Sequence, residues 1–148
     1  MFSHTPLQGV AFRVHGTPAP QGSKRGFVVN GRAVIADSNP ATLKTWRDEV
    51  KSAALDAMNG ALPFLGPVEL LVTFTLVKPK SVKRNLPYVR PDLDKLVRAT
   101  CDALTTAGVY KDDSQVVTIV TSKVYGILPG AAITVRELTD EHREAAVA

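Results

Sequence analysis

The segment RPDLDKLVRATCDALTTAGVYKDD, residues 90–113, carries two pairs of aspartates separated by one amphipathic stretch. Asp92 and Asp94 stand at the start of an expected helix, and Asp112 and Asp113 follow in the turn after it. The whole chain has a net charge of +4, and the acids of this segment are concentrated at two points that a single helix can bring together. Mg²⁺ is usually bound by one or two carboxylates together with water and a substrate phosphate. The segment therefore indicates a candidate metal site.

The helix in this segment is expected over residues 93–107, with Gly108 ending it. A helix of about 15 residues is roughly 22 Å long. Asp112 and Asp113 can join Asp92 and Asp94 only if the chain returns beside them on the following strand, and we expect that return.

A purely structural interpretation of the same residues is also open. An acid can cap a helix, and Asp94 and Arg98 have the i,i+4 spacing of an ion pair worth a few tenths of a kcal/mol. Turns are often rich in Asp. This interpretation does not explain why two acidic clusters stand at the two ends of one α/β unit.

The rest of the chain alternates strand-like and helix-like patterns. An Asn30-Gly31 pair predicts a tight hairpin turn, and Trp46 is expected as a core anchor of the first helix. The strand at residues 115–125 is expected to be central or long. The expected strands cover residues 10–15, 27–29, 32–35, 68–77, 115–125 and 131–138, and the expected helices cover residues 40–57 and 93–107.

Composition narrows the class of protein. A length of 148 residues suits one domain, and one cysteine excludes an internal disulfide framework. No apolar run approaches the roughly 20 residues that a membrane span needs, and the first residues do not resemble a signal peptide, so a cytoplasmic protein is expected. An isoelectric point near 9.4 is compatible with an anionic partner such as nucleic acid.

The cations gather in two expected loops. Ser23-Lys24-Arg25-Gly26 could approach a phosphate closely, although a solvated basic loop is the plainer interpretation. Residues 78–90, called the basic strap below, are expected to form a mobile loop just before the acidic segment. The strap contains no acid, and its cations are Lys78, Lys80, Lys83, Arg84 and Arg90.

The residues around the acidic segment resemble one known family. The combined pattern is Pro91-Asp92-Leu93-Asp94, Leu96, Arg98, Asp102-Ala103-Leu104, Ala107-Gly108, Asp112-Asp113-Ser114-Gln115-Val116 and Lys123-Val124-Tyr125. It is similar to the RusA-type Holliday-junction resolvases that are common in phages and prophages. The match covers about a quarter of the chain. Residues 20–25 also resemble the N-terminal loop of phage members, though less specifically.

The resemblance implies a dimeric, Mg²⁺-dependent endonuclease, with Mn²⁺ as an alternative ion, that resolves four-way DNA junctions by paired nicks. It places the three metal-binding aspartates of the family on Asp92, Asp94 and Asp113. The essential lysine of the family falls on Arg98, which keeps the charge but cannot donate a proton as lysine can. The usual Asn after the second aspartate is Lys95 here. The cations expected to contact DNA are Lys24, Arg25, Lys83, Arg84, Arg90, Lys95 and Lys123.

The expected architecture is a single α+β domain over residues 1–136, with a mixed, mainly antiparallel sheet and two main helices packed on it. Residues 137–148 are expected to form a tail that is either a frayed helix or disordered. The resemblance implies a bacterial cytoplasm as the site of action. Two other functions stay open: a non-catalytic junction-binding protein of the same fold, and a metal nuclease that acts on flaps, forks or RNA.

Overall fold

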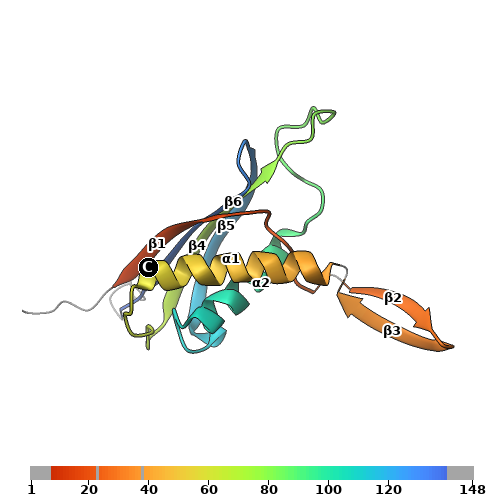
Figure 1. The fold of residues 1–148 in the computed structure, drawn as a ribbon. Helices are drawn as coiled ribbons and strands as arrows, with labels where there is room; N and C mark the ends of the chain where they lie inside the picture. The colour runs from red at the N-terminus through yellow and green to blue at the C-terminus, as the bar shows by residue number, and fades with distance from the viewer. Residues whose placement is uncertain (1–7, 23, 38, 140–148) are drawn as a thin grey trace, which may run out of the picture.

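A four-stranded sheet forms the centre of the molecule (Figure 1). The computed structural model describes residues 8–22, 24–37 and 39–139. The strand order is β1-β6-β4-β5, and only the β4–β5 pair is parallel. The predicted mixed, mainly antiparallel sheet is therefore confirmed. The strands are β1 (Gly9–His15), β4 (Val68–Val77), β5 (Val116–Gly126) and β6 (Gly130–Glu137).

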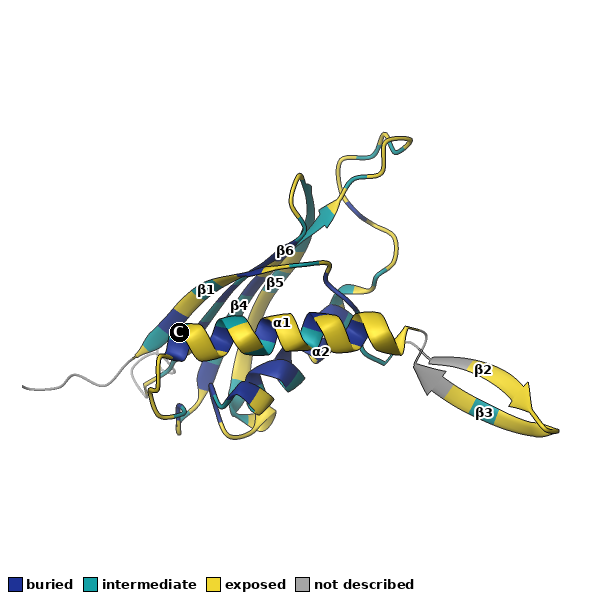
Figure 2. Cartoon of the chain, viewed as in Figure 1, coloured by how far each residue is buried: buried dark blue, intermediate teal, exposed yellow. Residues whose placement is uncertain are grey.

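Two helices pack together on one face of this sheet (Figure 1). The first, α1 (Pro40–Met58), contacts β1, and the second, α2 (Leu93–Ala107), contacts β5. In Figure 2 the buried stripe of α1 faces the sheet and the exposed stripe faces away. Trp46 is only 1% exposed, which confirms its predicted place in the core. The two helices and the sheet confirm the α+β class.

The core lies between the helices and the central strand β4. Alternate side chains of β4 point to the helices and are buried, as the period of a strand requires. Leu96 and Leu104 of α2 reach the same core and are fully buried. The position of α2, and with it the acidic segment, is thus set by apolar packing.

A hairpin stands apart from the main sheet. Its strands, β2 (Lys24–Val29) and β3 (Arg32–Asp37), pair only with each other and project beyond the N-terminal end of α1 (Figure 1). Asn30 and Gly31 both have positive φ, which confirms the predicted turn. Figure 2 shows the hairpin largely exposed.

The last strands differ in detail from expectation. β5 is long, with 11 residues, but it lies at the edge of the sheet rather than at its centre. β6 includes Glu137, one residue beyond the expected domain boundary, and the Leu138 N–H donates to the Pro67 carbonyl at 2.8 Å. Most of the predicted tail, residues 140–148, lies outside the described residues. Within the described ranges, the helices are too short or too polar to span a membrane.

The core position of α2 generates a stability prediction. Leu104→Ala should lower the free energy of unfolding by about 2–5 kcal/mol, because it opens a cavity at a fully buried site. The same substitution at Leu62, which is 85% exposed, is the matched control and should change stability by less than about 0.5 kcal/mol. Urea unfolding followed by circular dichroism measures both. Equal effects at the two sites would contradict this packing.

Candidate metal and nucleic-acid site

Asp92 and Asp94 lie together at the start of α2. Asp92 is the N-cap, with extended backbone, and Asp94 lies in the first turn, so both acids stand at the start of the helix as predicted. Both side chains are exposed. The Lys95 ammonium lies 3.3 Å from the Asp92 carboxylate, in a partly exposed pair that solvent weakens. Two exposed carboxylates at a helix start remain available to a cation.

Arg98 lies one turn further along α2 and is exposed. Within the described ranges, no ion pair joins it to Asp94, so the structural interpretation of that spacing is not realised. Gly22 lies against Arg98 instead. A Cβ atom at Gly22 would be 3.1 Å from Arg98 Nη1, and the φ of Gly22 is +96°, so this close approach suits glycine.

Gln21 fastens the loop before the hairpin to α2. Its backbone N–H donates to the Lys95 carbonyl at 3.0 Å, and its side-chain amide donates to the Asp102 carboxylate. The resemblance of residues 20–25 to the N-terminal loop of phage members did not predict these two contacts. The Gln-Gly pair between a proline-rich stretch and two cations was the available signal.

Asp113 lies outside α2, away from the first two aspartates. It begins a short 3₁₀ turn, η1 (Asp113–Gln115), directly before β5, and it is exposed. Burial raises the pKa of the Cys101 thiol and of the Tyr110 hydroxyl, and the nearby negative charge of Asp113 raises both further. Asp113 therefore lies beside the second half of α2.

The expectation that one chain brings Asp113 beside Asp92 and Asp94 is not met. In residues 8–22, 24–37 and 39–139, no three His, Cys, Asp or Glu side chains gather closely enough to hold one metal ion. The reason is geometric. The strand that follows a helix begins near the end of that helix, and only its later residues come back to the start of the helix.

Asp112 caps the turn rather than facing the other acids. Its carboxylate accepts a hydrogen bond from the Ser114 N–H at 2.8 Å. This backbone hydrogen bond lowers the pKa of Asp112, and the Ser114 side chain lowers it further. Asp112 thus has a local structural role, and Asp113 remains the candidate metal ligand of the second pair.

Gln115 is the residue of this turn that sequence reasoning missed. Its side-chain oxygen accepts from the backbone N–H groups of Lys111 and Asp112, at 2.8 and 3.0 Å. Its amide nitrogen donates to the Phe64 and Gly66 carbonyls, both at 2.9 Å. The Asp-x-x-Gln spacing of a capping box was the signal that could have identified it.

Lys123 fixes the backbone just before Asp92. Its ammonium donates to the carbonyls of Val89, at 2.6 Å, and Pro91, at 2.8 Å. Lys123 lies late in β5, so the returning strand does reach the start of α2, but with a lysine rather than with Asp113. Its predicted DNA contact stays a prediction, and its observed role is to position this segment.

The basic strap is tied to the sheet rather than loose. Besides the contacts of Lys123, the Arg84 Nε–H donates to the Tyr125 hydroxyl at 2.9 Å. The remaining cations predicted to contact DNA are distributed around the site. Lys83 and Arg90 are exposed on the strap, and Lys24 and Arg25 begin β2.

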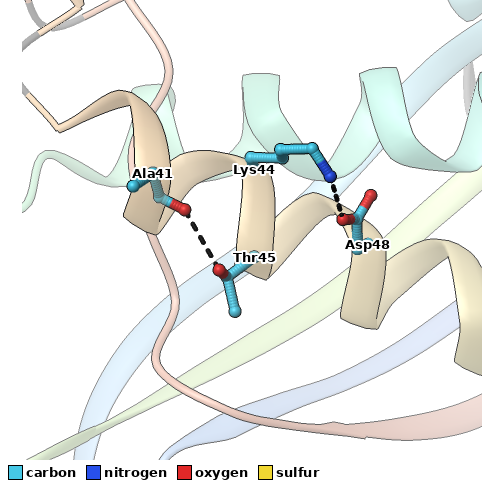
Figure 3. Close-up of polar contacts among 4 residues, drawn as sticks. All are labelled: Ala41, Lys44, Thr45 and Asp48. Carbon is cyan, nitrogen blue, oxygen red and sulfur yellow. Dashed lines mark hydrogen bonds and ion pairs between the residues drawn. The ribbon is translucent and has the colours of Figure 1, made fainter.

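A further group of cations lies on α1, outside the predicted set. Lys44 pairs with Asp48 at 2.7 Å, and Thr45 donates to the Ala41 carbonyl at 3.0 Å (Figure 3). The hydrogen bond from Lys44 lowers the pKa of Asp48. A hollow of 320 Å³ between α1 and α2 is lined by Pro40, Leu43, Lys44, Arg47, Asp48, Lys51, Ala103 and Thr106.

Comparison with known proteins identifies the family of this chain. The family described as Endodeoxyribonuclease RusA matches residues 16–136. The chain belongs to the RusA family. It is also 32% identical over 142 residues to "Uncharacterized protein YqaN" of Bacillus subtilis (strain 168), a match that covers 88% of this chain and 97% of the relative. The RusA match includes the hairpin, the strap, both acidic pairs and β6, so the predicted family is confirmed over far more of the chain than its motifs.

The contacts of Lys123 generate a second prediction. Lys123→Met keeps much of the side-chain length but leaves two carbonyls without their charged donor, so the free energy of unfolding should fall by about 1–3 kcal/mol. Lys111→Met, at an exposed position, is the matched control and should have little effect. Thermal unfolding measures both variants. An unchanged melting temperature for Lys123→Met would show that these hydrogen bonds do not hold the segment.

Proposed function

We propose that this protein is a Mg²⁺-dependent endodeoxyribonuclease that nicks four-way DNA junctions symmetrically, within the cytoplasm of a bacterial cell. Membership of the RusA family over residues 16–136 supports this class of reaction. The observation that carries the proposal lies at the start of α2. Two exposed carboxylates, Asp92 and Asp94, directly follow a strap that has five cations and no acid. Acids bind the metal and cations attract the phosphate backbone.

The donor set fits the proposed cation. Mg²⁺ prefers hard oxygen ligands and keeps several waters, so two exposed carboxylates at one helix start suit it, and Mn²⁺ is the natural substitute. Asp92 and Asp94 would hold the ion. When bound, it supplies a Lewis acid that activates water and stabilises negative charge on the scissile phosphate.

Arg98 and Lys95 would act on the same phosphate from α2. Arg98 can bind two phosphate oxygens at once through its planar guanidinium, and it stays charged at every working pH. It cannot give a proton to the leaving oxygen, so that proton must come from water or from Lys95. The 3.3 Å pair with Asp92 keeps the Lys95 ammonium beside the candidate site.

The working enzyme is proposed to be a two-fold dimer in which one chain supplies Asp92 and Asp94 and its partner supplies Asp113. The support is the separation of these acids along α2 within one chain. A two-fold dimer also matches a junction that has two equivalent strands to cut. The proposed contact is the first half of β5, an edge strand that exposes Val117, Ile119 and Val120 directly after η1.

Phosphate contacts away from the site would be sequence-independent. The exposed Lys83 and Arg90 lie on the strap, and Lys24 and Arg25 begin the hairpin. Each phosphate contact releases counterions, so binding should weaken steeply as salt rises. The alternatives, a junction-binding protein without activity and a nuclease for flaps, forks or RNA, differ from this proposal in metal-dependent cutting and in substrate.

The proposal is tested by cutting a synthetic four-way junction with Mg²⁺. Wild-type protein should nick two opposing strands, and Asp94→Asn should reduce the rate roughly 100-fold or more because it removes a metal ligand. Asp56→Asn, an exposed acid late in α1, is the matched control and should cut normally. Binding is measured in parallel without metal.

Three outcomes would overturn parts of the proposal. Wild-type protein that binds the junction but never cuts it would favour the non-catalytic alternative. Faster cutting of a flap, fork or RNA hairpin than of the junction would replace the substrate. Normal cutting by Arg98→Ala would remove Arg98 from the mechanism.

A further inference from the structure

Three side chains on the strap and β5 form a compact stack. The Arg84 guanidinium carbon lies 5.7 Å from the ring centroid of Tyr88 and 5.9 Å from that of Tyr125. Its Nε–H donates to the Tyr125 hydroxyl at 2.9 Å. These separations are within the range of a cation–π contact. Arg84 therefore links an aromatic ring of the strap to one on the sheet.

Tyr88 is nevertheless 78% exposed, so most of its ring remains open. Its backbone is fixed on both sides. The Tyr88 N–H donates to the Leu86 carbonyl at 2.9 Å, and Lys123 donates to the carbonyl of the next residue, Val89. An exposed ring on a fixed backbone has little freedom to lose when it binds a partner.

Two side chains of the stack, those of Arg84 and Tyr125, line a hollow beside the segment that precedes Asp92. The hollow has a volume of 280 Å³, and Arg84, Tyr125, Arg90 and Pro91 are among the residues that line it. Pro91 directly precedes Asp92. Tyr88 is not part of the lining, but its two chain neighbours, Pro87 and Val89, are. The exposed ring of Tyr88 therefore lies next to this hollow.

We propose that Tyr88 stacks on an unstacked nucleobase at the branch point of the junction. The inference rests on the proposed function, because that nucleotide belongs to the strand whose phosphate is cut at Asp92 and Asp94. A paired duplex keeps its bases stacked on one another and offers only their edges, whereas a branch point can expose a base face. Arg84 is a positioning residue that holds the Tyr88 ring. Arg90, two residues after Tyr88, would contact the phosphate next to the stacked base.

The charge and the side chains of the strap indicate which kind of partner binds there. The strap has five cations and no acid, which suits a polyanion better than a protein surface of mixed charge. An exposed aromatic ring beside arginine is how proteins hold single-stranded nucleic acid without reading its sequence. The strap thus favours a junction over a duplex through one stacked base.

The test measures binding without divalent metal, so cutting cannot interfere. The probes are a four-way junction with 2-aminopurine at each branch-point position, and a duplex of the same length. Tyr88→Ala should weaken junction binding about 5- to 150-fold, the range for loss of one stacked base, and should abolish the fluorescence change at one position. Duplex binding should change less than about two-fold, and Tyr88→Phe should behave as wild type.

Leu86→Ala is the matched control, because Leu86 is 64% exposed on the same strap and should not affect either probe. Junction binding by Tyr88→Ala at wild-type strength, or equal weakening for duplex and junction, would overturn the stacking proposal. Cutting by the wild type with Mg²⁺ is scored separately. If Tyr88→Ala weakens junction binding but the wild type never cuts, the stacking proposal stands and the proposed nuclease activity is wrong.

Discussion

The length and direction of α2 constrain everything else in the candidate site. Its 15 residues span about 22 Å, and β5 runs back along it after a short turn. The residues at the beginning of β5 therefore lie near the end of α2, and those late in β5 lie near its start. Buried leucines hold α2 in that position, so the separation of the two acidic clusters follows from the packing of the core.

This constraint separates the acids of residues 90–113 into two groups with different surroundings. Asp92 and Asp94 are exposed and lie at the start of α2, where the Lys123 ammonium fixes the preceding backbone through two carbonyls. Asp113 begins the turn near the other end of α2, a turn that Asp112 and Gln115 stabilise. Lys123, on the sheet, positions the segment before Asp92 through its two carbonyl contacts.

The basic strap provides the positive charge next to the candidate metal site. Its contacts to β5 hold a loop of five cations as a fixed surface before the aspartates. In the proposed function these cations would attract the phosphate backbone of DNA without distinguishing a junction from a duplex. The exposed ring of Tyr88 is proposed to supply that distinction.

Most of the fold could be predicted because local patterns agree with the final packing. The stripe through Trp46, the Asn30-Gly31 turn and the alternation in β4 each depend on neighbours in sequence. The position of Asp113 could not be predicted in the same way, since it depends on which end of a strand returns to which end of a helix. The internal partners of Lys123 and Arg84 were also missed, because sequence records that a cation is present but not which carbonyl or hydroxyl it meets.

The central claim, that Asp92 and Asp94 of one chain work with Asp113 of its partner, has one direct measurement. Asp94→Asn and Asp113→Asn chains are co-expressed with different tags, the mixed dimer is purified through both tags, and nicking of a four-way junction is measured with Mg²⁺. Each parent should be inactive. The mixed dimer should regain one intact site and nick one strand per junction, because one chain still supplies Asp92 and Asp94 and the other still supplies Asp113. A mixed dimer as inactive as either parent would contradict the shared site.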